Sequence, residues 1–228
     1  MRGTPLFIAA PIFAICVALS PFQRASAAVT AAARNQKTVK TYARVLRTIN
    51  PHLQNWQSTN LAKHLLINAR RWKIDANLLV ALVTVESSWR TYAVSGAGAL
   101  GLGQLMPGTA RTLHVNAHDP YQNLQGAARY LHAMINKFAS SPHQYSLAFA
   151  AYNAGPRAVT AFGGIPPYDA TENYVVKVMR TWHTIARRVS AIAPQIANQT
   201  HIALKPAPKE KPAGNVAPDL TYWIGSKN

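Results

Sequence analysis

One carboxyl group in this chain is placed where it would keep its proton. Glu86 follows an apolar stretch, residues 78–85, and it is one of seven acidic residues in the sequence. Loss of hydration at such a position disfavours the charged form of a carboxyl group and raises its pKa. A carboxylic acid that stays protonated near neutral pH can donate a proton to a leaving group. Taken alone, however, a glutamate at a helix end is better explained by a bond to backbone or to Arg90.

Other chemistries receive less support from the residue pattern. Ordinary glycosidases use two carboxylates. Between Glu86 and Asn153 the sequence holds one further acid, Asp119, whose place before a proline favours a helix cap. His114 and His118 lie four residues apart without a third ligand at a standard spacing, so we expect neither a metal nor another cofactor.

Four short blocks at and after Glu86 favour the catalytic interpretation. In chain order they read ESSW from residue 86, SGAGALGLGQLMPGTA from 95, AYNAGP from 151 and NYV from 173. Over roughly residues 58–190, these blocks resemble the soluble lytic transglycosylase family, which is related to goose-type lysozyme. The resemblance implies a mostly α, lysozyme-like helical domain with a glycan-binding cleft.

The resemblance also implies roles for individual residues. Glu86 matches the catalytic acid, and Tyr152 and Asn153 match a tyrosine–asparagine pair that faces this acid. The remaining matches are residues that line the cleft beside the acid, Ser95, Gln104 and Met106, and a later aromatic position, Tyr174. The amide and hydroxyl groups among them suit the hydroxyl and N-acetyl groups of a sugar. One departure is Gly103, where the family often has methionine.

The implied reaction needs only one carboxyl group. It cleaves the β-1,4 bond between N-acetylmuramic acid and N-acetylglucosamine in peptidoglycan and closes a 1,6-anhydro ring on the muramic sugar. A lysozyme-type hydrolase is the alternative within the same fold. From another class, the domain could be a wall-binding accessory component of a secretion or conjugation apparatus, although Glu86 and the Tyr152–Asn153 pair argue against a purely binding role.

Periodicity predicts helices separated by glycine and proline turns, with almost no strand pattern. A helix near residues 76–88 is apolar nearly all round and follows Asp75 as its N-cap, so we expect it at the centre of the domain. The other expected helices are 59–73, a short one after Pro107, one opening at Asp119-Pro120, 146–153, and 171–191 with a strong amphipathic stripe.

The chain is predicted to fall into four parts. Residues 1–27 are typical of a signal peptide cut after Ala27, so the mature protein is expected in the periplasm or outside the cell. Residues 28–57 are interpreted as an N-terminal arm that starts as a loose segment. Residues 58–193 would form the catalytic domain, and residues 194–228 a flexible tail rich in proline and lysine.

The charge of the chain indicates an anionic environment. Without Arg2 and Arg24, which would leave with the leader, 22 basic residues stand against seven acidic ones, a net charge of +15. These charges are scattered and lack a basic-aromatic motif, which disfavours nucleic acid as a partner. Peptidoglycan glycan strands are the expected partner, and the protein is expected to be a monomer.

Overall fold

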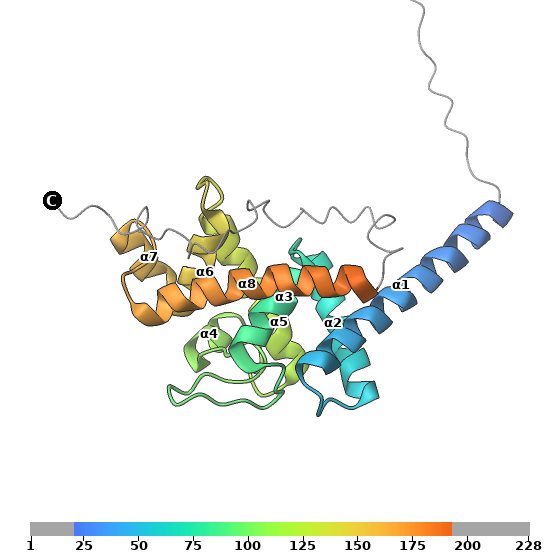
Figure 1. Ribbon diagram of the computed structural model, residues 1–228, viewed down its shortest axis with the longest axis horizontal. Coiled ribbons are helices and arrows are strands. Elements are labelled where there is room, and N and C mark those ends of the chain that lie inside the picture. Colours follow the sequence, from blue (N-terminus) through green and yellow to red (C-terminus); the bar gives the residue numbers. More distant parts are fainter. Residues whose placement is uncertain (1–20, 193–228) are drawn as a thin grey trace, which may run out of the picture. The chain divides into compact units, whose positions relative to one another are not determined.

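The computed structural model describes residues 21–192, and this part of the chain is helical (Figure 1). The helices are α1 Pro21–Ile49, α2 Asn55–Arg71, α3 Ala76–Ser87, α4 Pro107–Thr112, α5 Pro120–Lys137, α6 Gln144–Ala154, α7 Pro156–Phe162 and α8 Asp169–Ile192. Two isolated bridges, Val94 with Leu100 and Leu100 with Leu105, are the extended pairings found within these residues. The prediction of a mostly α fold is confirmed.

Helix α3 lies at the centre of the domain, as its apolar sequence predicts. Each side chain from Leu78 to Val83 is at most 1% exposed. Helix α8 packs along α3 and buries one stripe that includes Val178, Trp182 and Ile185. Burial of this stripe removes apolar surface from water, and each such side chain contributes about 1.5–3 kcal/mol to the stability of the fold.

Helix ends are fixed by the residues that the sequence indicates. The Asp75 carboxylate accepts the Asn77 amide as N-cap of α3, and it also accepts the indole N–H of Trp182 at 3.2 Å. Asp119 caps α5 through the amides of the next two non-proline residues. Gly155, with φ +87°, ends α6, and α7 begins at the following proline.

The prediction of a loose segment at residues 28–50 is wrong for residues 36–49. They form the second half of α1, and they belong to the compact unit that begins at Gln36. Tyr42, Val45 and Leu46 are buried in the core, and the Tyr42 hydroxyl donates to Asn77 Oδ1 at 2.9 Å. Alanine, lysine and arginine favour helix, and these apolar residues recur at helical spacing on one face.

Two further predictions concern residues that the structure describes only in part. Residues 1–20 of the expected signal peptide and the expected tail at 194–228 lie outside the described residues, while residues 21–27 begin α1. Among the described helices, none is both long enough and apolar enough to cross a membrane.

Candidate active site

Glu86 lies in the last turn of α3, and the chain turns sharply just beyond it. Ser88 and Trp89 both have left-handed backbone conformations, with φ of 51° and 61°. Non-glycine residues adopt this conformation only where the surroundings hold them in it. Here the Trp89 side chain is fully buried, its indole N–H donates to Thr84, and its carbonyl oxygen accepts the side-chain amide of Asn50 at 3.0 Å. The position of Glu86 is therefore set by buried contacts on both sides of the turn.

The carboxyl group of Glu86 meets a tyrosine from α8. The Tyr174 hydroxyl donates to Glu86 Oε1 at 2.5 Å, across a separation of 88 residues in the chain. Burial raises the pKa of Glu86 to about 7, although the Tyr174 hydrogen bond and the positive charge of Lys177 both act to lower it. The alternative of a bond between Glu86 and Arg90 does not describe this site, because Arg90 Nε donates to the Ser87 carbonyl oxygen instead.

The loop between α3 and α4 folds back on itself and is held by two of the predicted site residues. Ser95 Oγ accepts the Ala99 amide at 3.0 Å. Gln104 has φ +46°, and its side-chain amide donates to the carbonyl oxygens of Ala93 and Gly101. Both side chains thus stabilise the loop, and their contact with a sugar remains a prediction.

Asn123 on α5 ties this loop to the rest of the domain, and sequence reasoning missed it. Its side chain is fully buried and makes three hydrogen bonds to backbone: it donates to Leu100 O at 2.8 Å and Ala117 O at 2.9 Å, and it accepts the Gly103 amide at 2.8 Å. A Cβ at Gly101 would lie 2.4 Å from the Asn123 side-chain nitrogen, so the glycine allows this approach. A fully buried asparagine with every polar atom satisfied rigidifies its surroundings.

Tyr152 reaches the same loop from α6. Its hydroxyl donates to the Gly103 carbonyl oxygen at 2.8 Å, and its ring packs on Tyr130 with centroids 5.1 Å apart. The nearby charge of Glu86 adds to burial in raising the pKa of Tyr152. A Cβ at Gly103 would lie 2.3 Å from the Ala127 Cβ, which explains why this chain has glycine where the family often has methionine.

Asn153 and Tyr174 are linked through the start of α8. Asn153 is exposed to solvent, but its Oδ1 accepts a hydrogen bond from the hydroxyl of the buried Thr171 at 2.9 Å. Tyr174, one helical turn further along α8, bonds Glu86. Of the predicted residues, the structure therefore brings Glu86 and Tyr174 into direct contact. Tyr152 hydrogen-bonds the loop at Gly103, and Asn153 hydrogen-bonds α8 at Thr171.

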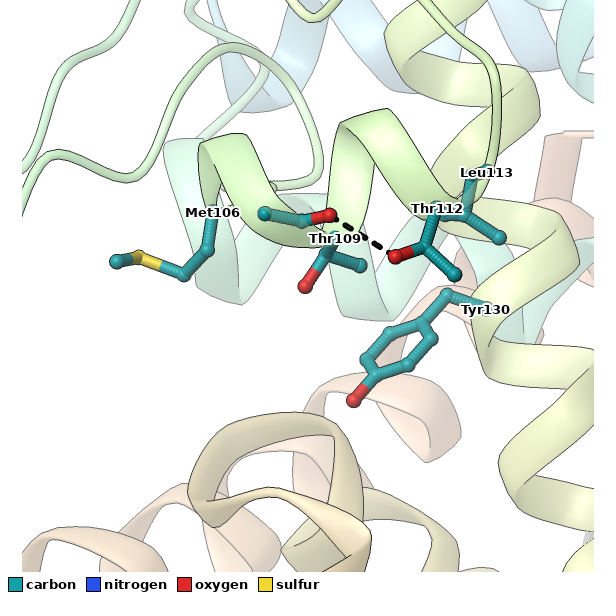
Figure 2. A pocket seen from close by; sticks show the side chains of 6 residues that line it. Met106, Thr109, Thr112, Leu113 and Tyr130 are labelled. Carbon is teal, nitrogen blue, oxygen red and sulfur yellow. Dashed lines mark hydrogen bonds between the residues drawn. The ribbon is translucent and has the colours of Figure 1, made fainter.

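A hollow of about 470 Å³ opens at Tyr130, whose ring packs on Tyr152 (Figure 2). The residues that line it are Met106, Gly108, Thr109, Thr112, Leu113 and Tyr130. Figure 2 shows the Tyr130 ring and the Met106 side chain at its edge, with the Thr112 hydroxyl bonded to the Gly108 carbonyl oxygen. Its volume lies within the range of small-ligand sites. Met106 at the hollow is one of the residues predicted to line the cleft beside the acid, and that role remains a prediction, whereas Tyr130, in the amphipathic pattern of α5, carried no distinguishing signal. Within residues 21–192, no group of three or more potential metal ligands is found.

The fold and the site together define a helical domain in which a buried glutamate with a raised pKa, Glu86, accepts a hydrogen bond from a tyrosine of α8. Residues 64–174 match the family described as the Transglycosylase SLT domain. The chain is 31% identical over 174 residues to a transglycosylase of Enterobacteria phage PRD1, covering 74% of this chain and 58% of that protein. It is 35% identical over 112 residues to membrane-bound lytic murein transglycosylase F of Pseudomonas fluorescens, covering 47% of this chain and 23% of the relative.

A solved structure shares the fold. An inactive variant of the lytic transglycosylase Slt from Pseudomonas aeruginosa superposes with a TM-score of 0.51 and 24% identity, over 66% of this chain and 30% of that one. The domain at residues 64–174 belongs to the transglycosylase SLT family. The chain spans little more than half the length of the phage relative and about a quarter of the Pseudomonas fluorescens protein.

Proposed function

We propose that this protein is a peptidoglycan lytic transglycosylase that cuts the β-1,4 bond between N-acetylmuramic acid and N-acetylglucosamine. Glu86 serves as its single acid and base. The observation that carries the proposal is the environment of Glu86, whose burial raises its pKa to about 7 while a tyrosine hydroxyl holds it in place. A carboxyl group with this pKa is partly protonated and partly ionised at neutral pH, so it can both give and take a proton.

The reaction uses Glu86 twice. Its carboxyl group protonates the bridging oxygen, the bond from that oxygen to C1 of the muramic sugar breaks, and the N-acetyl carbonyl oxygen of the same sugar stabilises the cation at C1. The Glu86 carboxylate then takes the proton of the 6-hydroxyl group, whose oxygen bonds to C1. The product carries a 1,6-anhydro ring, Glu86 is protonated again, and no water is consumed.

The placement of the other described carboxylates supports a one-carboxylate site. Asp75 and Asp119 are N-caps that accept backbone amides, and Asp169 and Glu172 lie in the first turn of α8. The groups that shift the pKa of Glu86 besides burial are a tyrosine and a lysine. Intramolecular attack by the 6-hydroxyl group has an effective concentration far above that of water, so it does not need a second carboxylate to activate it.

Mass spectrometry of digested, purified peptidoglycan tests the proposal against a lysozyme-type hydrolase. We expect strands that end in 1,6-anhydro-muramic acid, about 18 mass units lighter than the reducing ends of hydrolysis. The Glu86→Gln protein should lose cleavage by about a hundredfold or more, while Asp119→Asn, which can still cap α5, should release the same product at a similar rate. Mainly reducing ends would refute the transglycosylase assignment, and near-normal cleavage by Glu86→Gln would refute the role of Glu86.

The proposed substrate also agrees with the charge and the leader of the sequence. A net charge of +15 after removal of the first 27 residues suits the anionic polymers of the cell wall. We propose that the protein acts in the periplasm or outside the cell, where this substrate lies.

A further inference from the structure

Two aromatic side chains are exposed to solvent and contact each other near the Glu86 site. Phe162, the last residue of α7, is 53% exposed, and Tyr168, directly before α8, is 46% exposed. Their rings meet edge to face, with centroids 5.7 Å apart and an interplanar angle of 84°. Two neighbouring rings form a continuous apolar surface, which indicates a binding role more strongly than one isolated exposed side chain does. We call Phe162 and Tyr168 the aromatic pair.

The loop that carries the aromatic pair is fixed by its own contacts. Gly163 ends α7 in the left-handed conformation, with φ +64°, and the next glycine amide donates to Val159 O. Ile165 packs against the core, Pro166 is buried, and the Tyr168 amide donates to Pro166 O at 2.7 Å. A ligand that stacks on these rings would therefore meet a preformed surface and would not lose affinity by ordering a loose loop.

The aromatic pair is connected to the proposed active site through α6 and the start of α8. Helix α7 follows α6, which ends just after Asn153, and the chain returns at Thr171, whose hydroxyl donates to Asn153 Oδ1. Tyr168 precedes Tyr174 by six residues, and at the rise of a helix this is about 9 Å along the axis of α8. Helices α7 and α8 both pack on α6. A glycan strand of a few sugar units, held at Glu86, spans such a distance.

The chemistry of the pair suits a sugar ring. A pyranose with equatorial substituents presents C–H bonds on its two faces, and aromatic rings have electron-rich faces that attract such C–H groups. The Tyr168 hydroxyl adds a polar group that can bond a sugar hydroxyl at the edge of the ring. Neither side chain is charged, so the pair itself offers a sugar ring apolar contacts and one hydroxyl group.

We propose that the aromatic pair is a platform on which one sugar unit of the glycan strand stacks, away from the bond that is cut. The proposal rests on the proposed function in one respect, because it takes the ligand to be the strand bound at Glu86. The platform contributes to binding and does not touch the reacting atoms. It makes the protein bind long strands in preference to short fragments that cannot reach both places.

Equilibrium binding in a Glu86→Gln background tests the platform without cleavage. The Kd for purified glycan strands free of peptide stems is measured for this protein and for its Phe162→Ala, Tyr168→Ala and doubly substituted versions. We expect each alanine to weaken binding roughly three- to tenfold, and Tyr168→Phe, which keeps the ring, to restore most of the loss of Tyr168→Ala. A disaccharide, whose two units flank the bond at Glu86 and leave none for the platform, should show a much smaller effect than long strands.

Trp56→Ala in the same background is the matched control, because Trp56 on α2 is another aromatic residue that is 63% exposed. The platform is refuted if the double variant binds long strands as tightly as its parent, or if the control loses as much affinity. Thermal melting of each variant confirms folding. Failure of the platform leaves the anhydro product of the wild-type protein unaffected. Conversely, absence of that product overturns the proposed reaction while the binding result stands by itself.

Discussion

Removal of the Tyr174 hydroxyl should change the pH dependence of the reaction in a defined direction. This hydroxyl donates to Glu86 Oε1 at 2.5 Å and stabilises the ionised carboxylate, so it lowers a pKa that burial raises. Tyr174→Phe keeps the ring in place and deletes only the donor. The carboxyl group of Glu86 should then hold its proton to higher pH.

The size of this change follows from the contact. A hydrogen bond to a charged group contributes about 1.5–3 kcal/mol, and one pKa unit corresponds to about 1.36 kcal/mol. The pKa of Glu86, about 7 in the wild-type protein, should therefore rise by about one to two units.

The pH profile of kcat/KM for anhydro-product release measures this shift, because that ratio reports ionisations of the free enzyme. In the proposed reaction Glu86 must be protonated to donate to the bridging oxygen, so wild-type activity should fall as the pH rises through about 7. In Tyr174→Phe, the same fall should occur at a pH higher by one to two units, whatever the change in the maximal rate.

Tyr42→Phe is the control, since it removes another buried tyrosine hydroxyl, one that donates to Asn77 at the far end of α3. The fall of kcat/KM on the alkaline side of its pH profile should coincide with that of the wild type. An alkaline limb in Tyr174→Phe that is unmoved, or moved to lower pH, would show that the hydroxyl does not stabilise the Glu86 carboxylate.

Two further substitutions test the site through stability. Burial disfavours ionised Glu86, so the native state binds more protons than the unfolded chain between pH 4.5 and about 7. The free energy of unfolding of the wild type should therefore fall as the pH rises through this window. Measured by urea unfolding, Glu86→Gln should be as stable as the wild type below pH 4.5 and more stable by up to about 3 kcal/mol at pH 8. Gly103→Ala would place a Cβ 2.3 Å from Ala127 and should cost about 1–3 kcal/mol and most of the activity. Gly96→Ala, with open space around its Cβ, should do neither, and equal effects would contradict the steric argument.

Much of the fold could be predicted from patterns that are local in the sequence. The apolar run before Glu86 predicts a central helix, and Asp75 predicts where that helix begins. The same run predicts the raised pKa of the acid, because burial of the helix end follows from burial of the helix. The second half of α1 was missed because its many lysines and arginines hide a narrow apolar stripe around Val45.

The contacts that shape the site join residues far apart in the chain, and no periodicity reports them. Asn123 lies on the buried face of an amphipathic helix, where its three hydrogen bonds to the glycine loop leave no trace in the spacing of residues. The importance of Tyr174 came from family resemblance, whereas its bond to Glu86 is visible only once α8 lies against α3. The exposed aromatic pair depends on a loop conformation that glycine and proline permit but do not specify.

The bond between Glu86 and Tyr174 has a consequence for the order in which the chain becomes active. The acid is buried by α8, which follows it by 88 residues, so a growing or partly folded chain with α3 alone would expose Glu86 to water. In water a glutamic acid has a pKa of about 4.3 and is ionised at neutral pH. The incomplete molecule would therefore lack the proposed proton donor, which would form only once α8 is in place.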